Sequence, residues 1–289
     1  MLPSRFEYHR PDNLDEALAL LAEYGEEAKV LAGGMSLIPL MKLRFASPAH
    51  LIDVNRIVDI QGLSENGGGL VVKAVTRHAE LERSDLLKSR YPTMAAAAPL
   101  ISDPIVRNLG TIGGSLAHAD PSGDWGSVML ALGADVVARS STGERTIAAD
   151  DLFISNFATS LEPNELITEI RVPAPQGSHG GAYLKMERKV GDFATVGVAV
   201  HLVLDGGRIR SAGIGLTSVG PRNVKAHDAE ASLAGAEPTA EAFAEAGRLA
   251  AQAAEPMTDV RGSADYKRHV IDVYTRRGLA RAFETAQAA

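Results

Sequence analysis

Two short stretches of sequence decide the fold: Ala32-Gly33-Gly34-Met35-Ser36 and Ile112-Gly113-Gly114-Ser115. Each follows a short apolar segment and places two adjacent glycines where the chain is expected to turn. Because glycine has no Cβ atom, neighbouring backbone N–H groups can converge on one point and form a concavity that binds anions. Two such turns facing each other are suited to the two charges of a pyrophosphate. The alternative is that both pairs are ordinary turn glycines, and composition does not decide between these interpretations.

The residues around the first stretch are predicted to form a small unit of helices and strands. Asn13 and Glu16 have the spacing of a capping box, and leucines recur at helical spacing from Leu14 to Leu21, until Gly25 ends the helix. The other expected elements are strands over residues 29–31 and 51–54 and a short helix over 37–43, and the unit ends near Asp59.

A second unit is predicted to begin after a turn at residues 66–69. Leu109 to Ser115, which contains the second glycine pair, is expected to be a loop because it carries too much glycine for regular structure. The other expected elements are strands over 70–74, 135–139 and 166–172, a helix capped by Thr76, and helices over 93–100 and 126–132.

The stretch from Pro173 to Gly181 is dense in proline and glycine and is the best candidate for a linker. Beyond it, residues 195–204 and 208–216 are expected to form a hairpin, since Asp205-Gly206-Gly207 supplies the positive φ angles of a tight turn. Helices are expected over 225–233, 240–253 and 263–286. The predicted class is α+β, with two subdomains over about 1–59 and 60–175 and a small αβ C-terminal domain over 176–289.

The composition excludes several classes of protein. Of the 289 residues 45% are hydrophobic, too many for a disordered chain, yet no run of about 18 apolar residues suggests a transmembrane helix. The start of the sequence lacks the pattern of a signal peptide. With no cysteine, the chain cannot ligate an iron–sulfur cluster or form a disulfide. A net charge of −7 argues against a general nucleic-acid binder. We therefore expect a soluble, cytoplasmic protein.

Several sites of known chemistry are missing from the sequence. It contains no phosphate-binding P-loop, no His-Glu-x-x-His pair and no Gly-x-Ser-x-Gly elbow. Gly213-Ile214-Gly215 comes nearest to a dinucleotide fingerprint, but it lies in an expected strand and Ser218 replaces the third glycine. The eight histidines are dispersed without metal-ligand spacing. No catalytic residue and no metal site are predicted on this chain.

The two glycine stretches resemble the paired FAD loops in the medium subunit of molybdenum hydroxylases, the xanthine dehydrogenase and carbon monoxide dehydrogenase family. The similarity covers essentially the whole chain. The segments that carry it, besides Ala32-Gly33-Gly34-x-Ser36 and Thr111-Ile112-Gly113-Gly114, are Phe6-Glu7-Tyr8, Leu37-Ile38-Pro39 with Met41-Lys42, Pro48-x-His50-Leu51-Ile52-Asp53, Ala119-Asp120-Pro121 with Asp124, Glu165-Leu166-Ile167, and Arg188-Lys189-Val190-Gly191-Asp192-Phe193-Ala194.

This resemblance implies a fold and a set of partners. The fold would be a two-subdomain FAD-binding domain of the vanillyl-alcohol-oxidase (PCMH) type, followed by the small C-terminal domain. The family enzyme is a heterotrimer, usually doubled: a large subunit carries molybdopterin, a small subunit carries two [2Fe–2S] clusters, and this subunit passes electrons from FAD to an acceptor. The absence of cysteine agrees with that division of labour, because the clusters must lie on another chain. Peripheral association with a membrane quinone pool is compatible with such a subunit.

The resemblance also implies cofactor contacts at particular residues. Backbone N–H groups of the first stretch would hold one side of the pyrophosphate, with the Ser36 hydroxyl as a further donor, and the second stretch would hold the other side. The implied contact residues are Ala32, Gly33, Gly34, Met35, Ser36, Leu37, Thr111, Ile112, Gly113, Gly114, Ser115, Ala117, Asp120, Asp124, Leu161, Lys185, Asp192 and Phe193.

Three of these residues have competing interpretations. Asp124 would accept hydrogen bonds from sugar or ribityl hydroxyls, or it is the N-cap of the following helix. Lys185 would stabilise negative charge on the reduced flavin, or it is a solvated lysine on a strand. Phe193 would cover the flavin ring, or it is packed in the core. Met35 and Ser115 depart from the polar residue and the asparagine that relatives often carry, so both positions are expected to contact the cofactor mainly through the backbone.

Two other functions remain open from the sequence alone. One is a cofactor-free scaffold subunit whose glycine turns are only turns. The other is a free-standing flavin oxidase or reductase of the same fold, such as those that reduce peptidoglycan precursors, although no histidine or glutamate is assignable as its base. For the whole enzyme, the segment Arg188 to Ala194 looks most like carbon monoxide dehydrogenase, with purine or N-heterocycle hydroxylases as the alternative. The electron acceptor is not identified.

Overall fold

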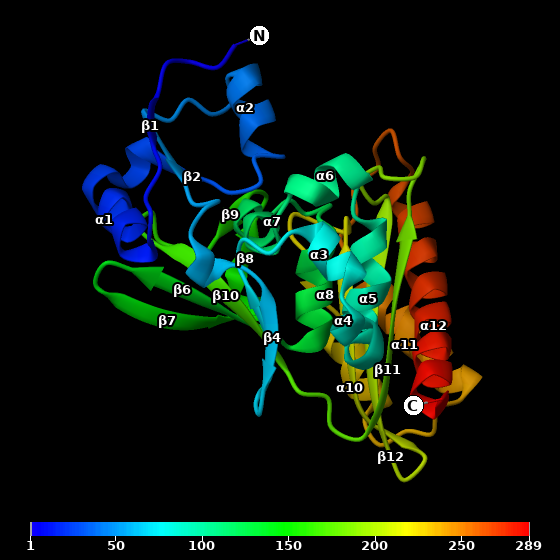
Figure 1. Cartoon of the computed structure of the whole chain (residues 1–289). Coiled ribbons are helices and arrows are strands. Elements are labelled where there is room, and N and C mark those ends of the chain that lie inside the picture. Colours follow the sequence, from blue (N-terminus) through cyan, green and yellow to red (C-terminus); the bar gives the residue numbers. More distant parts are fainter. Residues whose placement is uncertain (1, 289) are drawn as a thin grey trace.

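The structure, a computed structural model that describes residues 2–288, has three parts that follow one another along the chain (Figure 1). The first part is a parallel three-stranded sheet of order β1-β3-β2 with helices beside it. Its elements are β1 (Glu7–His9), α1 (Leu14–Tyr24), the 3-10 turn η1 (Gly25–Glu27), β2 (Ala28–Leu31), α2 (Leu37–Leu43), β3 (His50–Asp53) and η2 (Val58–Ile60). The expected cap of α1 is present, since the side chain of Asn13 accepts a hydrogen bond from the Glu16 N–H at 2.9 Å.

The second part is an antiparallel five-stranded sheet of order β4-β5-β10-β6-β7, accompanied by short helices. Its strands are β4 (Leu63–Asn66), β5 (Gly69–Lys73), β6 (Asp135–Ser140), β7 (Gly143–Ala148) and β10 (Leu166–Pro173), and a small ribbon is formed by β8 (Phe153–Ser155) and β9 (Ala158–Thr159). Its helices are α3 (His78–Arg83), α4 (Asp85–Arg90), α5 (Pro92–Ala97), η3 (Ala98–Leu100), α6 (Pro104–Leu109), α7 (Ile112–His118), α8 (Asp124–Leu132) and α9 (Ala149–Leu152).

The second glycine pair is helical, so the prediction of a loop over Leu109 to Ser115 is wrong. Thr111 is the N-cap of α7, and its hydroxyl accepts the Gly114 N–H at 3.1 Å. Gly113 is required for a different reason than a turn: a Cβ atom there would lie 2.6 Å from the Cβ atom of Ala74. The helix begins at the end of β5, and glycine lets the two backbones approach closely.

Two helix starts also differ from prediction. Thr76 does not cap α3, which begins at His78 after the N-cap residue Arg77; the Thr76 hydroxyl instead donates to the Gly62 carbonyl at 2.7 Å. Asp124 is the first residue of α8 rather than its cap, which is Gly123.

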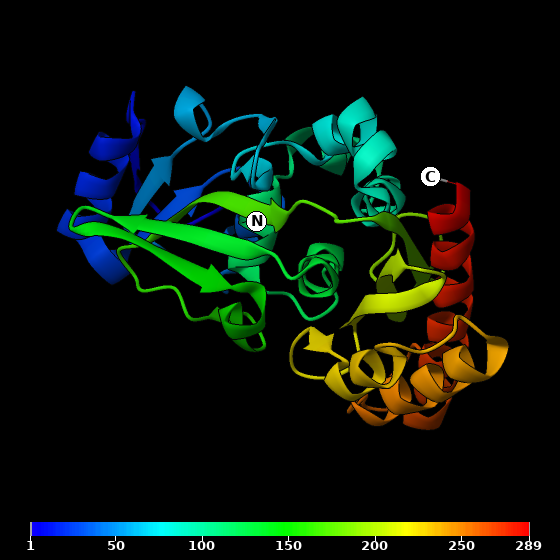
Figure 2. The same ribbon diagram turned by 90° about the horizontal axis from the view of Figure 1, so that it is seen from below.

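The third part is an antiparallel sheet of order β11-β12-β13-β14, backed by three helices (Figure 2). Its elements are β11 (Ser178–Met186), β12 (Val196–Asp205), β13 (Arg208–Thr217), β14 (Val224–Lys225), α10 (His227–Leu233), α11 (Ala240–Gln252) and α12 (Ala264–Ala288). The predicted hairpin is present, with Gly206 and Gly207 at φ +55° and +80°.

The predicted linker is shorter than expected, because Ser178 to Gly181 already belong to β11. Gly180 and Gly181 serve close packing rather than a turn. A Cβ atom on Gly180 would overlap the Ala282 carbonyl of α12, and one on Gly181 would overlap the Thr93 hydroxyl of α5. Only residues 174–177 lie between β10 and β11.

Each part has its own apolar core, and the second and third parts are tightly joined. Leu18 and Ile52 belong to the first core, Trp125 to the second, and Val198 to the third. Tyr183 and Ala199 of the third sheet are buried with the second core. Gly213 and Gly215 of β13 bring that strand against the backbone of α8, where a Cβ atom on either would overlap a carbonyl oxygen. These contacts fix the sheet of the third part against the second part, beside α8.

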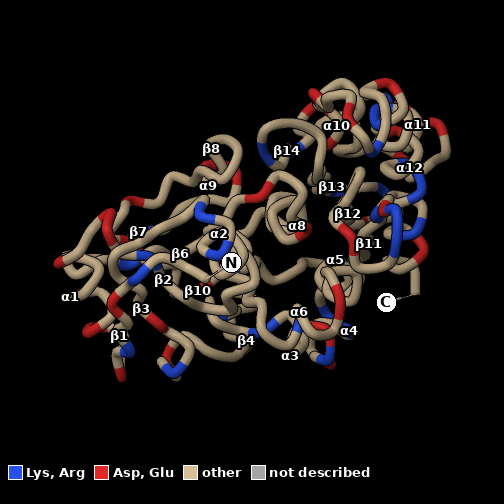
Figure 3. The backbone as a smooth tube through the Cα atoms, turned by 90° about the horizontal axis from the view of Figure 1, so that it is seen from above, with Lys and Arg blue, Asp and Glu red and all other residues tan. Residues whose placement is uncertain are grey.

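Charged residues of both signs are interspersed along the described chain rather than segregated by element (Figure 3). Among residues 2–288, no helix combines the length and the apolar content that crossing a membrane requires.

Candidate cofactor-binding site

A cavity of about 930 Å³ lies where the three parts meet, bounded by the first glycine stretch, the segment from α6 to α8, and the end of β11 with the loop that follows it. Its volume is in the range of cofactor pockets, roughly 300–1,000 Å³. Of the predicted contact residues, all line the cavity except Ile112, whose side chain is fully buried in the second core. Residues far apart in sequence are therefore brought to one site.

The first glycine stretch offers a row of unused hydrogen-bond donors. Within residues 2–288, none of the backbone N–H groups from Gly33 to Leu37 donates to an acceptor of the protein. Gly34 has φ +74°, which turns the chain into α2, and the N-cap residue Ser36 makes no side-chain cap. A row of unsatisfied N–H groups on a cavity wall is the arrangement that binds phosphate oxygens.

The second glycine stretch differs from the first, because its donors are already used. The N–H groups of Ile112 and Gly113 donate to the carbonyls of Thr76 and Ala74, and that of Ser115 donates to the Thr111 carbonyl. The predicted pair of equivalent backbone nests is therefore not what the structure contains. The second stretch contributes a helix start, the Thr111 and Ser115 side chains, and a surface without Cβ atoms at Gly113 and Gly114.

The two stretches are in direct contact behind the cavity. A Cβ atom on Gly33 would overlap the Leu109 carbonyl oxygen and lie 2.7 Å from the Gly110 Cα atom. Gly33 does not have a positive φ, so glycine is needed here for close approach, not for an unusual backbone angle.

Asp124 and Lys185 form a buried ion pair on the cavity wall. The Lys185 Nζ atom lies 2.9 Å from Asp124 Oδ2 and donates also to the Leu100 carbonyl at 2.9 Å, while the Tyr183 hydroxyl donates to Asp124 Oδ1 at 2.6 Å. The side chains of Lys185 and Asp124 are only 2% and 7% exposed. Lys185 is therefore not the solvated strand lysine of the alternative interpretation.

Burial raises the pKa of Asp124, although Lys185 and the Tyr183 hydroxyl oppose this shift. The pKa of Tyr183 is raised well above its ordinary value by burial and by the neighbouring Asp124. Both oxygens of Asp124 already accept hydrogen bonds from the protein. A ligand hydroxyl would have to share the carboxylate with Lys185 and Tyr183.

Asp192 and Phe193 lie at the opening of the cavity. Phe193 is 54% exposed, which rules out the alternative that it is packed in the core. Asp192 accepts hydrogen bonds from Arg188 at 3.3 Å and from Arg261 at 3.2 Å, and Arg261 also donates to the Phe193 carbonyl at 2.7 Å. These contacts attach the segment to the loop before α12.

His78 is a cavity residue that sequence reasoning missed. Its Nδ1 atom accepts a hydrogen bond from the Trp125 indole at 3.0 Å, so its proton is on Nε2. Burial, together with Arg107 and Arg77, lowers the pKa of His78 to about 4, which keeps the ring neutral at pH 7. The only sequence signal was an isolated histidine, since its partner Trp125 is 47 residues away.

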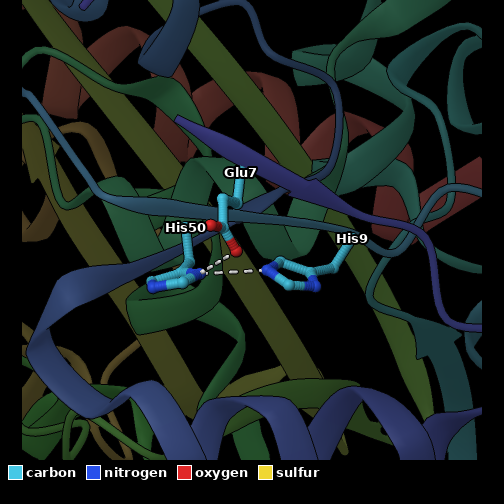
Figure 4. Close-up of side chains that lie close together, drawn as sticks. All are labelled: Glu7, His9 and His50. Atoms are coloured by element: carbon cyan, nitrogen blue, oxygen red, sulfur yellow. Dashed lines mark hydrogen bonds and ion pairs between the residues drawn. The ribbon is translucent and has the colours of Figure 1, made fainter. Parts of the chain in front are cut away.

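Glu7, His9 and His50 form a separate cluster of groups able to ligate a metal, which histidine spacing did not reveal (Figure 4). β1 and β3 are paired so that Glu7 lies opposite His50. His9 Nε2 and His50 Nδ1 lie 3.0 Å apart and share a hydrogen bond, and the Tyr24 ring stacks on His50 at 3.7 Å. The two nitrogens thus satisfy each other without an ion, and the cluster does not touch the cavity.

The similarity to known proteins follows the same division of the chain. A family model described as the FAD binding domain in molybdopterin dehydrogenase matches residues 4–175. The chain belongs to this family. A second model, the CO dehydrogenase flavoprotein C-terminal domain, matches residues 181–282. The resemblance stated from the sequence and the predicted fold class are confirmed, and the chain is an FAD-binding flavoprotein of the oxidoreductase class.

Relatives in this family align over nearly the full chain. The carbon monoxide dehydrogenase medium chain of Hydrogenophaga pseudoflava is 44% identical, covering 96% of this chain and 97% of that one. A solved carbon monoxide dehydrogenase from the same organism superposes with a TM-score of 0.95 at 46% identity, covering 99% of both chains. Quinoline 2-oxidoreductase from Pseudomonas putida 86 superposes with a TM-score of 0.91 at 31% identity, covering 100% of this chain and 99% of that one.

The cavity fits the cofactor that the family implies. FAD needs donors for two phosphates and a long, mostly apolar pocket, and the N–H row from Gly33 to Leu37 and the volume of about 930 Å³ meet those needs.

Proposed function

We propose that this chain is the FAD-carrying electron-transfer subunit of a molybdenum-containing dehydrogenase. The observation that carries the proposal is the row of unused N–H groups from Gly33 to Leu37 on a cofactor-sized cavity, in a chain that aligns end to end with medium chains of such enzymes. The flavin supplies a site that takes up electrons and gives them to an acceptor.

The chain's own residues would hold the cofactor in a defined direction. The N–H row of the first stretch and the Ser36 hydroxyl would bind the pyrophosphate, and Thr111 and Ser115 would bind it from the other side. The ring end would lie toward Leu161, Lys185 and Phe193, which line the same cavity. Lys185 would place a positive charge near the ring, where reduction adds negative charge, and Phe193 would shield one side of the opening.

Electrons would come from [2Fe–2S] clusters of a small partner subunit, and these from molybdopterin on a large one. This chain has no cysteine with which to ligate a cluster. Exposed apolar side chains near the cavity opening support a docked partner there. Val190 and Phe193 lie on the loop between β11 and β12, and Met257 and Val260 lie on the loop before α12. Arg261 ties the two loops together through Asp192 and the Phe193 carbonyl. We assign this surface to the iron–sulfur subunit of a cytoplasmic dimer of heterotrimers.

The whole enzyme is proposed to be an aerobic carbon monoxide dehydrogenase. The support is the 46% identity to a solved carbon monoxide dehydrogenase chain, against 31% to a solved quinoline 2-oxidoreductase chain. The second candidate is a hydroxylase of purines or N-heterocycles, which that structural similarity favours. Identification of the large subunit that co-purifies with this chain decides between them.

Flavin analysis of the purified chain tests the proposed cofactor. We expect one FAD per chain and no covalent link, since the sequence has no cysteine and no histidine suitably placed beside the ring for one. Acid denaturation should release the flavin into the supernatant, where chromatography identifies it as FAD. Flavin that stays with the protein pellet would contradict the non-covalent mode, and a chain that neither retains nor takes up FAD would leave only the scaffold function.

A further inference from the structure

Two polar side chains, Asn55 and Arg77, connect the two glycine stretches. Neither is among the residues that line the cavity. Asn55 follows β3 in the first part, and Arg77 precedes α3 in the second. The Arg77 Nη2 atom donates to Asn55 Oδ1 at 2.6 Å, so the pair crosses the boundary between the two parts. This inference rests on the proposed function, because it concerns how the FAD cavity is built.

Asn55 holds the entry of the first stretch. Its Nδ2 atom donates to the Ala32 carbonyl at 2.7 Å and to Asp53 Oδ1 at 2.7 Å. Asp53 is itself fixed by the Tyr8 hydroxyl at 2.6 Å. The amide nitrogen faces acceptors only, and the amide oxygen faces a guanidinium donor, so the orientation of the Asn55 amide is defined by its partners.

The bond to Ala32 determines where the first free donor points. The Ala32 carbonyl and the Gly33 N–H belong to one trans peptide, in which C=O and N–H point in opposite directions. Holding the carbonyl against Asn55 therefore turns the Gly33 N–H away from Asn55. Gly33 is the first residue of the row from Gly33 to Leu37, whose backbone N–H groups have no acceptor within residues 2–288.

Arg77 holds the segment that leads into the second stretch. Its Nη1 atom donates to the Leu109 carbonyl, three residues before the α7 start. The same carbonyl oxygen is the atom that a Cβ on Gly33 would overlap. The guanidinium thus lies at the contact between the two stretches, and its hydrogen bond to Asn55 Oδ1 links this contact to Asn55. A planar guanidinium can hold both acceptors at once, whereas an ammonium cannot match that geometry.

We propose that Asn55 and Arg77 are positioning residues for FAD: together they orient the Gly33 N–H and set the distance between the first glycine stretch and the start of α7. Neither touches the cofactor. Their effect is on the geometry that a pyrophosphate meets, so they control affinity for FAD more than stability of the fold.

The test measures the dissociation constant of FAD for the flavin-free full-length chain by quenching of flavin fluorescence. Asn55→Asp keeps the side-chain shape but turns an oxygen toward the Ala32 carbonyl, and Arg77→Met keeps length without donors. Each is expected to raise the dissociation constant at least tenfold. Arg77→Lys, which keeps one donor group, should fall between Arg77→Met and the wild type. Arg56→Met is the matched control, because Arg56 is exposed and, among the described residues, its side chain makes no hydrogen bond or ion pair; it should change the constant less than twofold.

The thermal midpoint of each flavin-free variant separates positioning from folding. Weaker FAD binding with a midpoint within about 2 °C of the wild type supports the proposal. Unchanged FAD affinity in both variants overturns the proposal. It is also overturned if affinity falls only in variants whose thermal midpoint falls as well, and if Arg77→Lys does not restore part of the affinity. A wild-type chain that binds no FAD overturns the proposed function and this inference together, whereas tight wild-type binding alongside unaffected variants overturns the inference alone.

Discussion

At Gly33 the backbone passes so close to the Leu109 carbonyl that a Cβ atom would overlap it, whereas at Gly34 the requirement is a φ of +74°. The sequence showed two adjacent glycines but not that they serve different purposes. Met35, the next residue, contributes an N–H group that any non-proline residue would supply. The identity of its side chain should matter little for binding the pyrophosphate.

These differences give a direct prediction for FAD retention. Gly33→Val should reduce FAD affinity at least tenfold, because the side chain must push the first stretch away from Leu109, and overpacking of this kind costs about 1–3 kcal/mol. Met35→Gln should leave affinity within twofold. Flavin content per chain after gel filtration measures both, and equal flavin in the two variants would show that the N–H row is not the phosphate site.

Two histidines, the buried His78 and the partly buried His201, give the stability of the fold a pH dependence. Burial lowers the pKa of both His78 and His201 to about 4, with Arg107 and Arg77 adding to the effect at His78 and His179 at His201. In the unfolded chain each would titrate near 6.5, so the unfolded state binds more protons between these values. The stabilisation is therefore complete above pH 6.5 and is lost as the pH falls toward 4.

We expect the free energy of unfolding to fall by roughly 3 kcal/mol per histidine across this window, from 1.36 kcal/mol per pKa unit. His201→Gln removes one titrating group, so its unfolding free energy should vary less steeply with pH than that of the wild type. Urea unfolding at pH 7, 5.5 and 4.5 measures this difference. Parallel curves for the two proteins would mean that the folded chain does not hold His201 in its neutral form.

At the scale of elements, prediction succeeded where a local pattern determines the outcome. The cap of α1 at Asn13 and the β12–β13 hairpin with its Gly206-Gly207 turn are set by neighbouring residues, and both are present. It failed at α7, where the same glycine content that normally opens a loop instead lets a helix start against Ala74. It failed also at Gly180-Gly181, where glycine serves contact with α5 and α12 rather than a turn.

The contact between α8 and β11 depends on residues that no local pattern could pair. Asp124 and Lys185 are 61 residues apart, and their ion pair, with Tyr183, joins the second part to the third. The family resemblance predicted both residues as cofactor contacts, and both line the cavity. Only the fold shows that they form an ion pair with each other.

Lys185→Met should destabilise the chain by about 3–5 kcal/mol at pH 7, because it leaves a buried carboxylate without its cation. The loss should shrink at lower pH, since the pKa of Asp124 is raised by burial and protonation removes the unpaired charge. Denaturant unfolding of the FAD-free chain at pH 7 and pH 5 measures both effects. Lys189→Met is the control, because Lys189 is exposed on the following loop and should have no effect beyond about 0.5 kcal/mol. A Lys185→Met chain as stable as this control would show that the pair contributes nothing.

At the scale of the whole molecule, the sequence supported a fold class and a family because the glycine stretches and the segments around them occur in a fixed order. It could not supply the asymmetry of the two stretches, the contact through Asn55 and Arg77, or the joining of α8 to the third sheet, since each depends on packing between distant segments. The absence of cysteine limits what this chain can hold by itself: any iron–sulfur cluster that feeds the flavin, as proposed above, would have to be ligated by another chain.

The most direct test of this account is anaerobic reduction of the flavin in the isolated chain and in a complex reconstituted with the small and large subunits proposed as its partners. An artificial electron donor should reduce the flavin of the isolated chain, whereas carbon monoxide should not. After the two partner subunits are added, carbon monoxide should bleach the visible absorbance of the flavin, as electrons pass from the molybdenum site through the clusters to FAD. If carbon monoxide or an N-heterocycle reduced the flavin of the isolated chain without partners, the chain would be a free-standing flavoenzyme and the subunit account would be wrong.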